Sequence, residues 1–112
     1  MLNHDYLNEI AGGDSEFIAE LLQDFLQQAP ELIAQVEQAI QAGDAAALQH
    51  AAHTLKGSAR SIGAELFAAS ALTLEQMGRS GQIENAPDAL QQLLQEWEQL
   101  RHYLHTQLQQ AA

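Results

Sequence analysis

The chain has 112 residues, no cysteine, and a formal net charge of −11 with only four lysines and arginines. This length predicts a single domain over residues 1–112, and the lack of cysteine excludes a disulfide framework and a thiolate metal site. The acidic balance argues against binding to nucleic acid or anionic membranes. Because no membrane-spanning apolar run or signal peptide is visible, we expect a cytoplasmic protein. Helical periodicity runs through the chain without strand-like alternation, which predicts an all-α fold.

The first two predicted helices are separated by a pair of glycines. A short helix at about 4–11 ends at Gly12-Gly13, and Asp14 is a suitable N-cap for the next helix. That second helix is apolar along 17–40, and we expect Pro30 to kink it or to split it in two.

Three further helices follow in chain order. The Gly43-Asp44 turn ends the second helix and caps the third, which covers about 44–62. Gly63 ends or bends that helix, and the remaining two are expected at about 64–80 and 86–109. The fourth helix is apolar or small at Leu66, Phe67, Ser70, Ala71, Leu74 and Met77, and we expect its stripe to be formed by Leu66, Ser70, Leu74 and Met77.

Short loops between the four longer helices make sequential helices antiparallel neighbours. We therefore expect an antiparallel up-down-up-down four-helix bundle with the short N-terminal helix packed against it. The apolar stripe on 17–40 is wider than one bundle face needs. Its surplus is either covered by Tyr6, Leu7 and Ile10 or left exposed as a docking surface.

The third helix gathers scarce cations around a histidine. At about 100° per residue, His53, Lys56 and Arg60 share one flank beside the apolar stripe. This grouping indicates a site for an anionic group, and a phosphoryl group carried on the histidine is the natural candidate. Gly57 lies just beyond them on the outward surface, where glycine costs roughly 1 kcal/mol. Bare backbone there would let another protein approach closely, unless Gly57 is only a tolerated weak spot or a packing contact.

The fourth helix adds Glu75 and Arg79, one turn apart. If the two helices form an antiparallel hairpin hinged at Gly63, Glu75 returns to the level of His53. Its carboxylate would then accept from imidazole Nδ1–H and leave the Nε2 lone pair as the nucleophile. Arg79 would reach a phosphate on Nε2. The alternative is an ordinary i,i+4 surface pair between Glu75 and Arg79.

Two other classes of function are open to a bundle with these residues. The bundle would be a non-phosphorylated adapter, a binding module, if His53 were an ordinary surface histidine. Metal binding is disfavoured because no glutamate has a histidine three residues later, as di-iron bundles require, and because Lys56 would repel a metal ion. We expect the other helical histidines, His50, His102 and His105, to lie on the solvent-exposed surface.

The segment around His53 resembles the phosphohistidine motif of histidine-containing phosphotransfer (HPt) domains, and the similarity extends over nearly the whole chain. The matching segments are His53 to Ala59, Ile62 to Ala64, Phe25 to Leu32, Ala42 to Asp44, and Leu74-Glu75. The resemblance implies that His53 is the phosphorylated residue, that Lys56 neutralises the phosphoryl group, and that Gly57 permits close docking of a receiver domain.

The resemblance also suggests roles for three other positions. Glu75 falls where family members place a carboxylate or amide that holds the imidazole, and Arg79 falls where some members carry a second phosphate-facing cation. Arg60 matches a position that is often basic, on the docking side.

The implied reaction is reversible phosphoryl transfer from a receiver aspartate to His53 and on to another receiver. The implied partners are receiver domains of a hybrid sensor kinase and of response regulators. We expect the chain itself to be a monomer. No nucleotide-binding motif is present, so we expect no autokinase activity and no cofactor, with Mg²⁺ supplied by the receiver. Met1 and the compact length favour a free-standing protein over a domain of a larger kinase.

Overall fold

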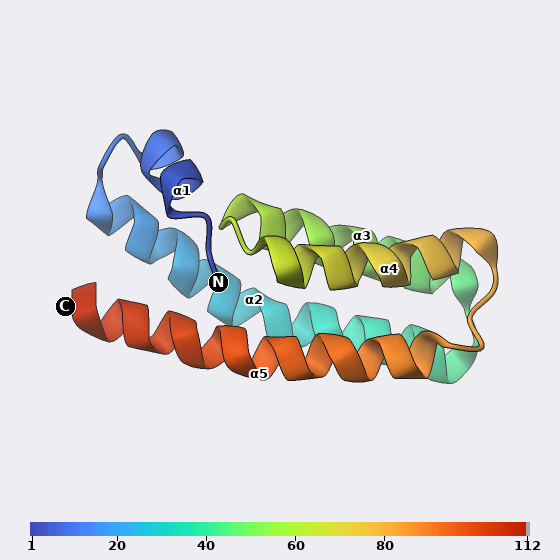
Figure 1. Cartoon of the computed structure of the whole chain (residues 1–112). Helices are drawn as coiled ribbons and strands as arrows, with labels where there is room; N and C mark the ends of the chain where they lie inside the picture. Colours follow the sequence, from blue (N-terminus) through green and yellow to red (C-terminus); the bar gives the residue numbers. More distant parts are fainter. Residues whose placement is uncertain (112) are drawn as a thin grey trace.

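The computed structural model describes residues 1–111, which fold into five helices without a strand. The all-α prediction is therefore confirmed. No helix within this range is long and apolar enough to cross a membrane. The helices are α1 (His4–Ala11), α2 (Ser15–Ala42), α3 (Ala45–Ser61), α4 (Glu65–Ser80) and α5 (Ala86–Ala111) (Figure 1).

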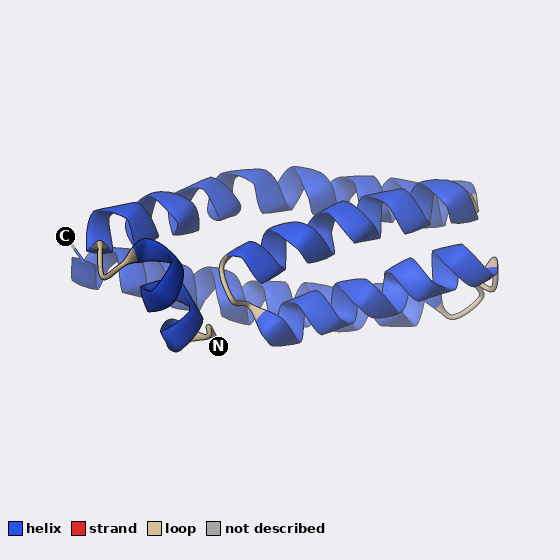
Figure 2. Ribbon diagram, turned by 90° about the horizontal axis from the view of Figure 1, so that it is seen from above, coloured by secondary structure: helices blue, strands red, loops and turns tan. Residues whose placement is uncertain are grey.

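The four longer helices form the predicted antiparallel bundle. Each consecutive pair runs in opposite directions, and α5 closes the bundle by packing against both α4 and α2 (Figures 1 and 2). The predicted short N-terminal helix, α1, lies beside the first turns of α2 and near the connection between α3 and α4. The closest pairing is between α3 and α4, the two helices on which the sequence locates the candidate site.

An aromatic cluster joins three helices in the core. Phe25 of α2, Phe67 of α4 and Trp97 of α5 lie with their ring centroids 6.0–6.1 Å apart, and Phe25 meets both partners edge to face. Such geometry stabilises aromatic pairs by about 0.5–1.5 kcal/mol beyond burial alone. The same hydrophobic core contains leucines from the other helices, including the fully buried Leu55 and Leu93.

The predicted N-caps are confirmed. The Asp14 side chain accepts hydrogen bonds from the backbone N–H groups of Glu16 and Phe17, and the Asp44 side chain accepts one from Ala47. These bonds satisfy donors that a helix start otherwise leaves without a partner. Both α2 and α3 therefore begin where local chemistry favours a start.

Gly63 ends α3 in the manner expected of glycine. Its φ of 73° lies in the left-handed region, which side chains with a Cβ rarely adopt. Its carbonyl accepts a hydrogen bond from the backbone N–H of Asn3 at 2.9 Å, so the N-terminal segment is held against this turn. The turn reverses the chain and sets α4 antiparallel to α3.

Pro30 does not split α2, which is one continuous helix from Ser15 to Ala42. Of the two predicted outcomes, the split does not occur, and the axis of α2 instead changes direction along its length (Figure 1). Proline removes one backbone donor and crowds the preceding turn. The buried residues Ala29 and Ile33 on either side hold the helix to the core through this weak point.

The wide apolar stripe of α2 is only partly covered by α1. Leu7 is buried, but Ile10 and Phe17 remain 44% and 42% exposed near the junction of the two helices. Part of this apolar surface is therefore covered and part is exposed, and its use as a docking surface stays a prediction.

The predicted stripe of α4 is displaced by one residue. Leu66 is 73% exposed, because the neighbouring Phe67 points into the aromatic cluster and successive helical residues lie about 100° apart. The buried face of α4 consists of Phe67, Ala68, Ala71, Leu74, Glu75 and Gly78. This correction brings Glu75 inside the bundle face, whereas the sequence pattern had suggested a position off the stripe.

Candidate functional site

Glu75 is the centre of the candidate site. Its side chain is 2% exposed. Within residues 1–109, Glu75 is the only charged residue that is buried. Burying a carboxylate is costly unless it is paired and hydrogen-bonded. Its surroundings therefore have to supply positive charge or hydrogen-bond donors.

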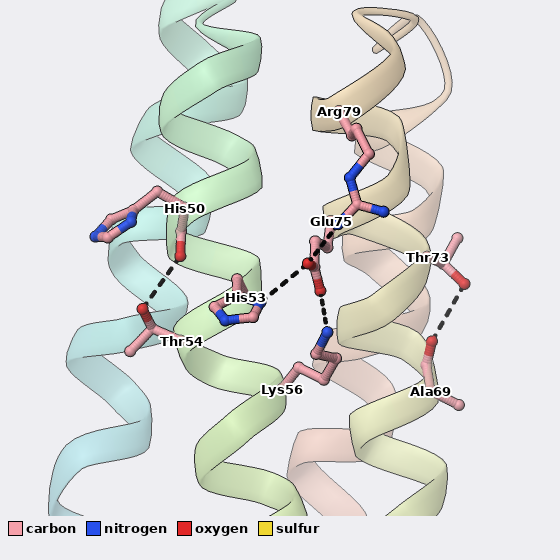
Figure 3. Close-up of polar contacts among 8 residues, drawn as sticks. All are labelled: His50, His53, Thr54, Lys56, Ala69, Thr73, Glu75 and Arg79. Carbon is pink, nitrogen blue, oxygen red and sulfur yellow. Dashed lines mark hydrogen bonds and ion pairs between the residues drawn. The ribbon is translucent and has the colours of Figure 1, made fainter.

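Three side chains converge on this carboxylate (Figure 3). His53 Nδ1 and Arg79 Nη2 each lie 3.0 Å from Glu75 Oε2, and Lys56 Nζ lies 2.5 Å from Oε1. The hydrogen bond from Lys56, followed by the one from His53, lowers the pKa of Glu75 against the opposing effect of burial. Glu75 is therefore an ionised carboxylate at neutral pH.

The geometry defines the hydrogen-bonding state of His53. An ionised carboxylate can only accept, so the neutral imidazole donates its Nδ1 proton to Glu75 and carries its lone pair on Nε2. The side chain is 65% exposed, and the Nε2 edge of the ring faces away from Glu75 (Figure 3). A buried carboxylate thus orients an exposed nucleophilic nitrogen.

The two cations of the cluster, Lys56 and Arg79, differ in their exposure to solvent. Lys56 is 12% exposed, whereas Arg79 is 61% exposed. The sequence did not predict that Lys56 would pair with Glu75, whereas the i,i+4 pair between Glu75 and Arg79 was one of its two alternatives and is present. Beside these groups lies an open recess of about 390 Å³, lined by Ala46, Gln49, His50, His53, Glu75 and Arg79.

The other two predicted site residues lie outside this cluster. Gly57 is exposed on α3, and a Cβ placed there would meet nothing within 4 Å apart from its own helix. Arg60 is exposed near the end of α3, where it lines a separate recess of about 430 Å³ together with Tyr6 and Glu65. The shared flank of α3 therefore spans two recesses. His50, His102 and His105 are exposed as expected.

Gly78 was not singled out by the sequence, yet it lies beside this site, next to Gln49, which lines the recess. It is buried on α4, and a Cβ there would lie 2.5 Å from the backbone nitrogen of Gln49 on α3. The sequence did offer one sign, a glycine inside a helix next to Arg79. It could not show which residue Gly78 contacts, because that residue lies on a different helix.

A pH experiment tests the ion pairs of Glu75. Because the pKa of Glu75 is lowered in the folded chain, these pairs contribute stability above the ordinary glutamate value of 4.5, and the contribution is lost as the pH falls through the lower folded value. We expect Glu75→Gln to lower the melting temperature at pH 7 and the gap from wild type to narrow below pH 4.5. Thermal unfolding by circular dichroism across this range measures the gap. A gap that does not change with pH would contradict the assignment.

Comparison with known proteins gives two findings. A family model described as "Hpt domain" matches residues 20–103. The crystal structure of histidine-containing phosphotransfer protein B (HptB) from Pseudomonas aeruginosa PAO1 superposes with a TM-score of 0.90 and 30% sequence identity, covering 97% of this chain and 95% of that one. No curated protein matches the chain significantly.

Proposed function

The chain belongs to the Hpt domain family and is a histidine phosphotransfer protein of phosphorelays, and from this premise we propose that His53 Nε2 carries the phosphoryl group. The observation that supports this assignment is the hydrogen bond of 3.0 Å between His53 Nδ1 and Glu75. It leaves the lone pair on the exposed nitrogen, where a partner protein can reach it.

The proposed reaction begins with a receiver domain that carries an aspartyl phosphate. The Nε2 lone pair attacks phosphorus and forms an N–P bond, while the P–O bond to the aspartate breaks and the carboxylate leaves with the electron pair. The attack places positive charge on the imidazole ring, and the adjacent Glu75 carboxylate offsets that charge. The reverse sequence passes the phosphoryl group to a second receiver.

Lys56 and Arg79 supply the positive charge of the proposed site. Both already lie within contact distance of the Glu75 carboxylate, so neither has to cross the bundle to approach a group on His53. The more exposed Arg79 borders the recess beside the ring, where a guanidinium can hold phosphate oxygens with two parallel hydrogen bonds.

Several finer features belong to the same proposal. The partners are receiver domains of a hybrid sensor kinase and of response regulators, which approach at Gly57 and Arg60 and bring the Mg²⁺ that the transfer needs. The chain acts as a cytoplasmic monomer and does not phosphorylate itself from ATP. Incubation with phosphorylated receivers, with a small phosphoramidate, or with ATP alone tests which donors phosphorylate the chain. Phosphate on His53 is expected only with the first two donors.

Lys56→Ala is expected to slow transfer in both directions. The change removes one cation near the transferred group and one partner of Glu75. Loss of a single electrostatic stabiliser can cost on the order of 10²–10³ in rate, and an open, solvated site should lose less than that. Rates are measured with a phosphorylated receiver in single-turnover experiments.

Arg101→Ala is the matched control for Lys56→Ala. Arg101 pairs with Glu98 on α5, so its removal also breaks an ion pair and changes the net charge equally, but away from His53. Equal rates for Lys56→Ala and wild type would show that Lys56 does not act on the transferred group.

A further inference from the structure

Gly78 marks a close approach between the backbones of α3 and α4 beside the candidate site. A Cβ at this position would lie 2.5 Å from the nitrogen of Gln49, 2.8 Å from its Cα, and 2.7 Å from the carbonyl oxygen of Ala45. Real Cβ atoms essentially never approach within 3.0 Å of another heavy atom. All three neighbours are backbone atoms, so no rotation of a side chain relieves the clash.

Backbone conformation does not explain this glycine. The glycines with positive φ are Gly12, Gly13, Gly43, Gly63 and Gly81, and Gly78 has ordinary helical geometry. Since glycine costs roughly 1 kcal/mol relative to alanine inside a helix, the close approach of α3 is the structural reason for it.

The contact lies one turn away from the hydrogen bond that orients His53. Gly78 follows Glu75 by three residues on α4, and Gln49 precedes His53 by four residues on α3. One helical turn corresponds to about 5.4 Å along the axis. The separation of the two backbones at Gly78 therefore determines how far Glu75 must reach to contact His53 and Lys56.

We propose that Gly78 is a positioning residue, which sets the spacing between α3 and α4 that allows Glu75 to hold the imidazole with Nε2 as the open nitrogen. The proposal rests on the proposed role of His53. Restoring ordinary van der Waals contact of 3.4 Å around an added methyl group requires the backbones to separate by about 0.9 Å. Such a shift, added to the 3.0 Å between Nδ1 and Oε2, exceeds the range of a hydrogen bond.

Gly78→Ala tests the proposal through the tautomer of His53. In wild type, ¹⁵N NMR of the neutral imidazole should show the proton on Nδ1. In Gly78→Ala, the tautomer ratio should move toward Nε2–H, which free imidazole side chains favour. Phosphorylation of the full chain by a small phosphoramidate should slow by up to about 100-fold, the cost that a misplacement of 1 Å can impose.

Leu104→Ala separates positioning from stability. Leu104 is fully buried near the C-terminal end of α5, whereas Gly78 lies near the end of α4, close to where α5 begins. This variant therefore loses core packing without touching the contact at Gly78. We expect it to lower the melting temperature while the tautomer ratio and the phosphorylation rate stay at wild-type values. Equal changes in Leu104→Ala and Gly78→Ala would overturn the proposal, as would a folded Gly78→Ala with the wild-type tautomer.

The tautomer measurement also separates this proposal from the proposed function. If wild-type His53 takes up no phosphate, the proposed function fails, but the effect of Gly78→Ala on the tautomer is still measured. Should Gly78→Ala unfold in buffer, the spectra are recorded in trimethylamine N-oxide, which favours the compact state. A chain that stays unfolded there would also overturn the proposal, since glycine would then be required for folding as a whole.

Discussion

His53→Gln is expected to abolish phosphate uptake from both receiver domains and small phosphoramidates while the bundle stays folded. Glutamine has no nucleophilic ring nitrogen, so no N–P bond can form. Its amide N–H group can still donate to Glu75, and the exposed position of residue 53 means that no core packing is lost. Phosphate incorporation is measured by intact-mass spectrometry, and folding by thermal unfolding.

His50→Gln is the matched control for this substitution. His50 precedes His53 by one turn on α3, is exposed, and lines the same recess. We expect this variant to take up phosphate as wild type does. Acid-labile phosphate on His50, His102 or His105 in the His53→Gln chain would contradict the assignment of the acceptor.

Much of the fold could be predicted because the signals for helix ends are local. Asp14 and Asp44 cap their helices with their own side chains, and Gly63 ends α3 through its own φ. The contact between His53 and Glu75 could be predicted from the turn at Gly63, which joins α3 to α4. The two residues lie eleven positions before and after Ala64, so an antiparallel hairpin brings them to the same level.

The features that could not be predicted depend on how two helices pack. The burial of Glu75 follows from the orientation of α4, which Phe67 fixes by joining Phe25 and Trp97 in the core. A sequence stripe that places Leu66 inward fits the helical period almost as well. The close approach at Gly78 depends on the backbone of α3 and leaves no pattern along α4.

The second large effect is expected at Gly57, through docking rather than folding. A Cβ at this position has open space, and glycine is less favourable than other residues in a helix by roughly 1 kcal/mol. Gly57→Gln should therefore keep or raise the melting temperature. Helical side chains lean toward the N-terminus over the preceding turn. The new side chain at i+4 thus projects beside His53, in the space that a receiver domain must occupy.

Gly57→Gln should reduce transfer from a phosphorylated receiver to background while a small phosphoramidate still phosphorylates His53, because only the larger donor needs the surface around the ring. Ala47→Gln is the control, since it adds the same side chain at an exposed position on α3 about 120° around the helix from His53, and it should transfer normally. Gly57→Ala should fall between wild type and Gly57→Gln, because its methyl group covers less of the approach. Receiver transfer at the wild-type rate in Gly57→Gln would refute a docking role for bare backbone at this position, and equal loss with both donors would show that the side chain obstructs the nitrogen itself.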